Sequence, residues 1–454
     1  MSKGMMTIEE LRAAVESGEI DTVLVCFVDM QGRLIGKRVT GWFFLEHGQE
    51  ELHACDYLLT VDMAMEPVPG YATASWDKGY GDFVMRPDMA TLRRVPWLEG
   101  TALMLADLLD QHGALLPHAP RSMLANQLAK AKEMGFISKI GTELELYVFD
   151  EPVEAMAERG FRNPKTAGRY IQDYHILQTT REEPLIRAIR NALDNAGIPV
   201  EFSKGEWGPG QEEINLRYAE AQEMCDRHAI YKNAAKEIAH LQGKAVSFMA
   251  KWNHDMAGNS CHIHNSLWTA DTDEAVMHDP SDAHGMSKLF KHYLAGQIAA
   301  VRDMTYFLAP TVNSYKRFQA GSFAPTKAVW SGDNRTAGFR LVGQGPALRV
   351  ECRIPGADVN PYLAAAALVG AGLYGIEHEL ELEPMVEGNA YQQKVREIPK
   401  TLVDAIALLD GSDLMRAIFG DQVVDHYVHT ARWEQAEFDR KVTDWELQRY
   451  FEQV

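Results

Sequence analysis

The hydrophobic and polar positions near the N-terminus predict a helix followed by a β-hairpin. Thr7 and Glu10 have the spacing of a capping box, so we expect a short helix that ends before residue 18. Residues 21–39 are rich in β-branched and apolar residues and are interrupted by a polar, glycine-containing turn at 29–32, which is typical of a hairpin. Glycines and prolines break the pattern from 56 to 97, where we expect loops.

After residue 117 the pattern changes to helix-like and strand-like segments that follow one another. Helices are predicted at 122–134, 182–195, 219–242, 287–308 and 361–378. Strands are predicted at 137–149, 245–252, 261–268, 338–342 and 348–354. The sequence therefore indicates an α+β protein with a small β-rich domain at 1–116 and a larger catalytic domain at 117–454.

Composition excludes several classes of protein. The 454 residues are 46% hydrophobic, enough for a large core, and their net charge of −19 argues against a nucleic-acid partner. No apolar stretch approaches the roughly 20 residues of a membrane helix, and the N-terminus does not resemble a signal peptide. The 5 cysteines are scattered without CxxC spacing, which favours reduced thiols and a cytoplasmic location.

Three strand-like segments each place two functional groups on one face. Residues i and i+2 of a strand point the same way, and this applies to Glu143 with Glu145, His262 with His264, and Glu351 with Arg353. A fourth segment adds carboxylates around a turn. Carboxylates with one imidazole suit Mg²⁺ or Mn²⁺. A first ion could be held by Glu145, Glu206 and Glu213, and a second by Glu143, His262 and Glu351. A lone glutamate is more often a solvated surface charge.

Arginines are concentrated between residues 317 and 353. The planar guanidinium matches phosphate and carboxylate, so this stretch indicates an anionic substrate bound together with metal ions; structural salt bridges are the alternative. The members are Arg317, Arg335, Arg340, Arg349 and Arg353. The chain has no Walker-type loop, no GxGxxG and no GxSxG motif. The His-x-His pair also occurs in metal-dependent amidohydrolases, although near the first strand rather than after half the chain.

Six segments together resemble the glutamine synthetase family: GTELELYVFD, EWGPGQEEI, GNSCHIHNSL, PTVNSYKRF, DNRTAGFR and LRVECRIPGADVNPYLAAAAL. The resemblance covers most of the chain after residue 117 and, more weakly, the N-terminal hairpin. It implies an N-terminal β-grasp domain and a C-terminal catalytic domain with a curved antiparallel sheet and helices. It also implies a homo-oligomer, commonly a dodecamer of two hexameric rings.

The resemblance assigns the same metal ligands and adds a reaction. ATP phosphorylates the γ-carboxylate of glutamate with two or more Mg²⁺ or Mn²⁺ ions bound, and a nitrogen nucleophile then displaces phosphate. Nucleotide-binding positions fall on Glu201, His264, Ser266 and Arg349, with Arg340 near the phosphates. Positions for glutamate or its phosphorylated form fall on Gly258, Arg317, Arg335 and Arg353. Arg335 and Arg340 would stabilise the transferring phosphoryl group.

Departures from the family pattern concern the nucleophile. Glutamine synthetases carry a glutamate in the flap that follows the NSYKR motif, and this chain has Phe323 there. The DGSS segment that completes the ammonium site is replaced by CDYLLTVD, and Ala257 stands where an asparagine is usual. Asp82 resembles a loop residue that reaches a neighbouring active site, and Tyr174 could cover the acceptor pocket.

These departures lead to the hypothesis of a γ-glutamyl-amine ligase that uses a small primary amine, with ethanolamine favoured and a polyamine possible. Two alternatives stay open. One is a true glutamine synthetase with an unusual flap. The other is a non-catalytic family member with a structural or regulatory role, which should have lost metal ligands or phosphate-binding arginines.

Overall fold

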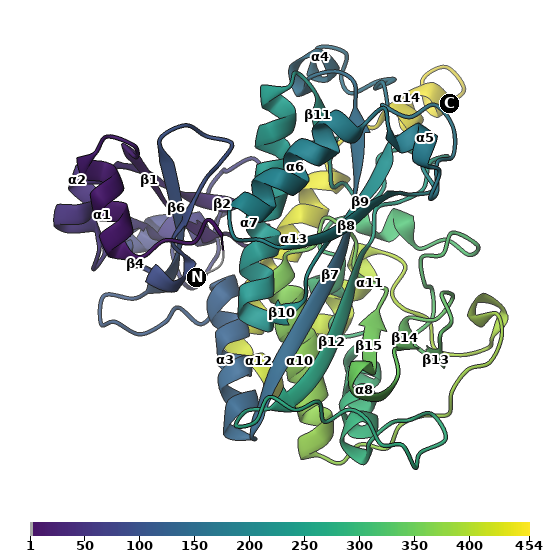
Figure 1. Ribbon diagram of the computed structural model, residues 1–454. Helices are drawn as coiled ribbons and strands as arrows, with labels where there is room; N and C mark the ends of the chain where they lie inside the picture. Colours follow the sequence, from purple (N-terminus) through teal and green to yellow (C-terminus); the bar gives the residue numbers. More distant parts are fainter. Residues whose placement is uncertain (1–2) are drawn as a thin grey trace.

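The computed structural model describes residues 3–454, which form a smaller and a larger part, each built around its own sheet (Figure 1). The predicted α+β class is confirmed, because both parts combine helices with mainly antiparallel strands. The proposed division at residues 116 and 117 falls between the last strand of the smaller sheet and the first helix of the larger part.

The smaller part contains a 6-stranded sheet in the order β2-β1-β6-β4-β3, with β5 paired to β6. Its strands are β1 Thr22–Val28, β2 Leu34–Thr40, β3 Leu52–Cys55, β4 Asp82–Pro87, β5 Arg93–Arg94 and β6 Thr101–Leu109. β1 and β2 form the predicted hairpin, and β1 runs parallel to β6. Helix α1 Ile8–Glu16 carries the predicted capping box, and α2 is Gly41–Phe43. The prediction of loops at 56–97 was wrong for β4, which pairs with β3 and β6, and for β5, which pairs with β6.

The larger part contains a 9-stranded sheet in the order β13-β14-β15-β12-β7-β9-β8, with β10 and β11 paired to β7. Its strands are β7 Phe136–Phe149, β8 Val200–Gly205, β9 Gln211–Leu216, β10 Ala219–Glu220, β11 Ala245–Ser247, β12 Cys261–Thr269, β13 Trp330–Gly332, β14 Phe339–Val342 and β15 Arg349–Cys352. The central pairs are antiparallel, so the catalytic segments predicted from the sequence become neighbours.

Helices cover this sheet (Figure 1). They are α3 Pro120–Glu133, α4 Val153–Ala157, α5 Ile176–Thr179, α6 Glu183–Asn195, α7 Ala221–Leu241, α8 Lys288–Ala300, α9 Thr305–Leu308, α10 Pro361–Glu377, α11 Leu402–Asp410, α12 Asp413–Phe419, α13 Asp421–Asp439 and α14 Asp444–Tyr450. α3 and α7 pack against β7, and α10 packs against α3, α7 and α8. No helix among residues 3–454 is long and apolar enough to cross a membrane.

Two predicted elements differ in extent. The helix predicted at 287–308 is divided into α8 and α9 by a turn at 301–304, and the strand predicted at 245–252 is only β11. Beyond β11 the chain stays apolar in Phe248, Met249 and Ala250, and an apolar run does not show where its backbone pairing stops. Between α8 and α9 the turn contains the charged residues Arg302 and Asp303.

The two parts are tied together by a buried arginine. Arg121 at the start of α3 donates to Asp88 at 2.6 Å and to Asp226 at 3.0 Å, and it also contacts Asp107. Asp88 and Asp107 belong to the smaller part and Asp226 to α7. Burial disfavours the charge of an isolated guanidinium, but the neighbouring carboxylates stabilise the charge of Arg121. The interface between the two parts therefore contains paired charges.

Candidate active site

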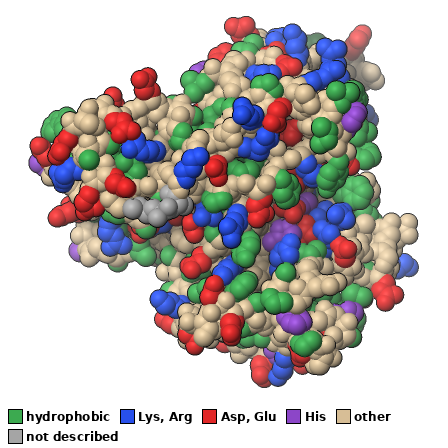
Figure 2. All heavy atoms as spheres, viewed as in Figure 1, with side chains coloured by type: hydrophobic (Ala, Val, Ile, Leu, Met, Phe, Trp, Pro, Cys, Tyr) green, Lys and Arg blue, Asp and Glu red, His purple; other side chains and the backbone are tan. Residues whose placement is uncertain are grey.

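A cavity of about 1250 Å³ opens on the larger part and is lined by residues of β7, β8 and β9 and of the loops around them. Acidic, basic and histidine side chains gather in a hollow near the middle of this part (Figure 2). The cavity wall includes many of the residues predicted from the sequence: Glu143, Glu145, Glu206, Glu213, Gly258, His262, Phe323, Arg335, Arg340 and Arg353. One concave site therefore brings together residues that are far apart in the chain.

The structure brings the carboxylates of the first predicted group together. Glu145 on β7 lies directly opposite Glu213 on β9, and Glu206 follows β8. Each of the three offers an oxygen, and these oxygens lie within 4.8 Å of one another. The turn between β8 and β9 is held by Gln211, which accepts from the Gly208 amide at 2.9 Å and donates to Glu145 at 3.1 Å.

These carboxylates are held in an environment that disfavours their charges. Burial and then the neighbouring Glu206 raise the pKa of Glu145 to about 8. Burial and the same neighbour raise the pKa of Glu213 well above its usual value. A hard divalent cation would remove this repulsion, and carboxylate oxygens are the ligands that such cations prefer. The donor set therefore fits Mg²⁺ or Mn²⁺.

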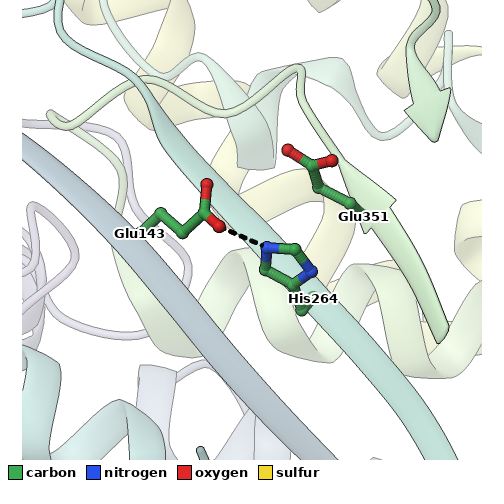
Figure 3. A group of neighbouring side chains, drawn as sticks. All are labelled: Glu143, His264 and Glu351. Atoms are coloured by element: carbon green, nitrogen blue, oxygen red, sulfur yellow. Dashed lines mark hydrogen bonds and ion pairs between the residues drawn. The ribbon is translucent and has the colours of Figure 1, made fainter. Parts of the chain in front are cut away.

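The second group lies on β7 and on the next two strands of the same sheet, β12 and β15 (Figure 3). Glu143, His264 and Glu351 offer atoms within 4.8 Å of one another, and His264 Nε2 lies 2.8 Å from Glu143. His262 Nδ1 is 3.1 Å from Glu143 and 3.4 Å from Glu351. Burial would raise the pKa of Glu143, but the two histidines hold it well below its usual range. Either histidine can therefore serve as a ligand beside the two carboxylates.

Arginines surround the second group. Arg340 Nη1 lies 2.9 Å from one Glu351 oxygen and Arg353 Nη1 lies 2.5 Å from the other. Arg335 lies in the cavity wall with them. Arg317 is different: it is 3% exposed and lies behind the wall, where it donates to the Ser260 hydroxyl at 3.1 Å. Because the Ser260 amide donates to Glu145 at 2.7 Å, Arg317 supports the first carboxylate group from behind.

Apart from Arg340, the predicted nucleotide-binding residues lie outside the cavity wall. Ser266 and Arg349 are two residues from His264 and Glu351 on their strands, so they continue the same sheet face. Arg349 Nε donates to His264 Nδ1 at 3.1 Å. Glu201 is an exposed residue at an irregularity of β8. The sheet face beside the second group thus offers a polar surface next to the cavity.

Three other predicted residues have distinct surroundings. Phe323 lines the cavity, is 57% exposed and has a φ of +60°, a left-handed conformation that a bulky residue rarely adopts. A Cβ on Gly258 would lie 2.6 Å from Arg317 Cγ and 2.7 Å from the Ala250 carbonyl oxygen, so this position needs glycine. Asp82 begins β4 in the smaller sheet, and the cavity wall does not include it.

The cavity wall also includes three residues that were not predicted from the sequence: Lys204, Asp173 and Ser260. Lys204 on β8 lies opposite Glu213 and two residues before Glu206, so strand alternation could have identified it. Asp173 and Ser260 follow no such pattern, because their positions depend on loops.

Comparisons with known proteins identify relatives of this chain. Residues 117–450 match the family model described as glutamine synthetase, catalytic domain. The chain is 51% identical over 451 residues to the γ-glutamylethanolamide synthetase of Streptomyces coelicolor, covering 98% of this chain and 96% of that one. It is 34% identical to the glutamate–isopropylamine ligase of a Pseudomonas species, with 98% of each chain covered. A solved structure of GmaS in complex with ADP aligns with a TM-score of 0.85 at 26% identity, covering 98% of this chain and all of that one.

The chain belongs to the glutamine synthetase family and is an enzyme, a carbon–nitrogen ligase. Within the family it resembles the ligases that couple glutamate to amines.

Proposed function

We propose that this protein is an ATP-dependent γ-glutamyl-amine ligase that phosphorylates the γ-carboxylate of glutamate and couples it to a small primary amine. Ethanolamine is the favoured acceptor and a polyamine is the second. The observation that carries the proposal is the wall of the cavity, which combines two carboxylate groups with Phe323 where a flap acid would bind ammonium. The names of two relatives, which specify ethanolamide and isopropylamine, support the same class of acceptor.

Each part of the wall has a role in this reaction. Glu145, Glu206 and Glu213 would hold one divalent ion, and Glu143, Glu351 and a histidine a second. Bound ions would supply charge stabilisation for the phosphoryl group. Arg340 and Arg353 both contact Glu351, and Arg335 lines the same cavity. These three guanidinium groups can therefore bind the phosphoryl and carboxylate oxygens of the substrates.

Nucleotide binding is proposed for the sheet face next to the cavity. His264, Ser266 and Arg349 project from β12 and β15 on the same side as the second carboxylate group. Gly141 lies opposite His264 on the neighbouring strand. Glu201 lies on β8, the edge strand of the sheet. These residues would place the terminal phosphate of ATP near the metal groups.

The two alternatives make different demands on the cavity. A true glutamine synthetase needs an acid that binds ammonium in the flap, and Phe323 supplies an aromatic ring instead. A non-catalytic member would not need to keep six metal ligands and three arginines around one cavity. The first feature favours an amine over ammonia, and the second favours a catalytic protein.

We also propose a cytoplasmic homo-oligomer, a dodecamer of two hexameric rings, in which Asp82 of one copy reaches the cavity of the next. The exposed position of Asp82 on the smaller part is compatible with this role. Light scattering that gives the mass of a monomer at working concentration would reject it.

The test of the proposed function is phosphate release from ATP and glutamate with ammonia, ethanolamine, putrescine, spermidine or isopropylamine as the acceptor. We expect the highest kcat/KM with ethanolamine, and mass spectrometry should identify the γ-glutamyl amide. Ammonia as the best acceptor by a wide margin would support a glutamine synthetase, and no turnover with any acceptor would support the non-catalytic alternative.

A further inference from the structure

The flap, residues 319–324, forms one side of the cavity and is tied to the rest of the protein by a single tyrosine. Its cavity-lining members are Gln319, Gly321, Ser322 and Phe323. Among residues 3–454, one hydrogen bond joins the flap to a segment outside residues 315–324: the Tyr391 hydroxyl donates to the Ala324 carbonyl oxygen at 2.9 Å. This bond therefore decides how firmly the flap is held.

Hydrophobic burial does not hold the tip of the flap. Phe323 is 57% exposed, and its φ of +60° is a conformation that costs free energy in a bulky residue. The Ser322 amide and hydroxyl donate to the Gln319 carbonyl oxygen at 3.2 and 2.6 Å, which shapes the flap but attaches it to nothing else. Tyr391 binds the residue directly after Phe323, where the strained tip begins.

The segment that carries this tyrosine is anchored to a second wall of the cavity. Asn334 Nδ2 donates to the Gly388 carbonyl oxygen at 2.7 Å, and the Thr336 hydroxyl accepts from the Ala390 amide at 3.0 Å. Asn334 and Thr336 flank Arg335, which lines the cavity. The segment therefore connects the flap with the loop of Arg335.

The tyrosine is fixed in place on its own side as well. Asn389 Oδ1 accepts from the Tyr391 amide at 3.0 Å. Farther along, the same segment pairs with the chain that follows the flap, where Lys327 lies opposite Glu397 and Lys327 Nζ is 2.7 Å from Glu397 Oε1. Burial raises the pKa of Tyr391, so its hydroxyl keeps the proton that it donates.

We propose that Tyr391 is a positioning residue that holds the flap over the activated glutamate and links the flap to the loop of Arg335. The proposal rests on the proposed function. When the flap opens over γ-glutamyl phosphate, a water molecule attacks the γ-carbonyl carbon and the bond from this carbon to the phosphate oxygen breaks. Glutamate, inorganic phosphate and a proton are released, and ATP is consumed without amide formation. The bond to Ala324 favours the closed flap and so limits this loss.

Tyr391→Phe removes only the hydroxyl and tests this role. Phosphate release from ATP and glutamate without any amine should rise about fivefold, the effect of one neutral hydrogen bond on the equilibrium between closed and open flap. With saturating ethanolamine, the wild-type protein should release one phosphate per amide, and the variant should release more phosphate than amide. The KM for ATP should not change, because the proposed nucleotide face is untouched. A phosphate assay and mass spectrometry of the amide measure these quantities.

Thr336→Val removes the anchor at the other end of the link. It should also release more phosphate than amide, and combining it with Tyr391→Phe should have no further effect, because both changes interrupt one connection. Additive effects in the double variant would overturn the link between the flap and the loop of Arg335.

Tyr374→Phe is the matched control. Tyr374 on α10 is half-buried like Tyr391, but it stacks on His378 and does not line the cavity, so this variant should keep one phosphate per amide. A merely structural role of Tyr391 would lower phosphate and amide equally in Tyr391→Phe, and this result would overturn the proposal while the proposed function stands. Absence of amide from the wild-type protein with every amine and with ammonia would refute the proposed function, and the role of Tyr391 would fall with it.

Discussion

Glu145 on β7 and Glu213 on β9 face each other across one antiparallel pair, 6% and 5% exposed, with a third carboxylate, Glu206, beside them. Such a pair is unfavourable without a cation. The repulsion between these carboxylates explains why this part of the sheet should bind a metal ion. The first two predictions below follow from it.

Removing one charge from the pair should weaken metal binding. Glu145→Gln keeps the shape of the side chain and its contact with Gln211, but it removes a charged ligand, so we expect the affinity for Mg²⁺ or Mn²⁺ to fall about tenfold or more. Isothermal titration calorimetry with Mn²⁺ measures the change. Glu220→Gln, on an exposed residue before α7, is the control. Unchanged affinity in Glu145→Gln would remove it from the metal site.

The stability of the metal-free protein should fall as the pH rises. The pKa of Glu145 in the folded protein is about 8, above its usual value of 4.5. The folded state therefore holds a proton that the unfolded chain has lost, and this contribution to stability disappears as the pH rises through 8. Glu213 acts in the same direction.

Thermal unfolding in EDTA and in Mg²⁺ between pH 5.5 and 9 tests this. We expect the melting temperature in EDTA to decrease over this range, and Mg²⁺ to reduce the slope because the ion replaces the protons. Glu145→Gln should flatten the EDTA curve. A wild-type melting temperature that rises with pH in EDTA would contradict the assignment.

Phe323 should control the choice between amines and ammonia. Phe323→Glu places a carboxylate in the cavity wall, so kcat/KM for ammonia should rise about tenfold, as expected for one added charged contact, while that for ethanolamine falls. Steady-state phosphate release measures both. Phe323→Leu keeps an apolar side chain and should keep the preference for the amine; a gain of ammonia use in this variant as well would mean that size, not charge, decides.

Gly258 should tolerate no side chain. The Cβ of Gly258→Ala would lie 2.7 Å from a backbone oxygen that cannot move alone, and it would also displace Arg317. We expect a loss of about 1–3 kcal/mol of stability and a raised KM for glutamate. Gly411→Ala, where the nearest atom is 3.5 Å away, is the control. Wild-type values for Gly258→Ala would show that the cavity wall relaxes more easily than the structure indicates.

Much of the fold could be predicted because it depends on local patterns. The capping box at Thr7, the N-terminal hairpin, strands β7 and β12 and helix α10 all follow from periodicity and from cap or turn residues. β4 and β5 could not be found in this way. Their backbone bonds go to β3 and β6, and the sequence of 56–97 shows only its glycines and prolines.

Part of the candidate site could also be predicted from local patterns, and part of it could not. Strand alternation alone placed Glu143 with Glu145 and His262 with His264, because i and i+2 share a face whatever the partner strand is. Only tertiary structure decided the register that sets Glu145 opposite Glu213 and His264 opposite Glu351, since register depends on pairing between distant strands. It also decided that Arg317 lies behind Ser260 and that a loop brings Asp173 to Lys204, because loops and buried side chains take their positions from packing that no local pattern encodes.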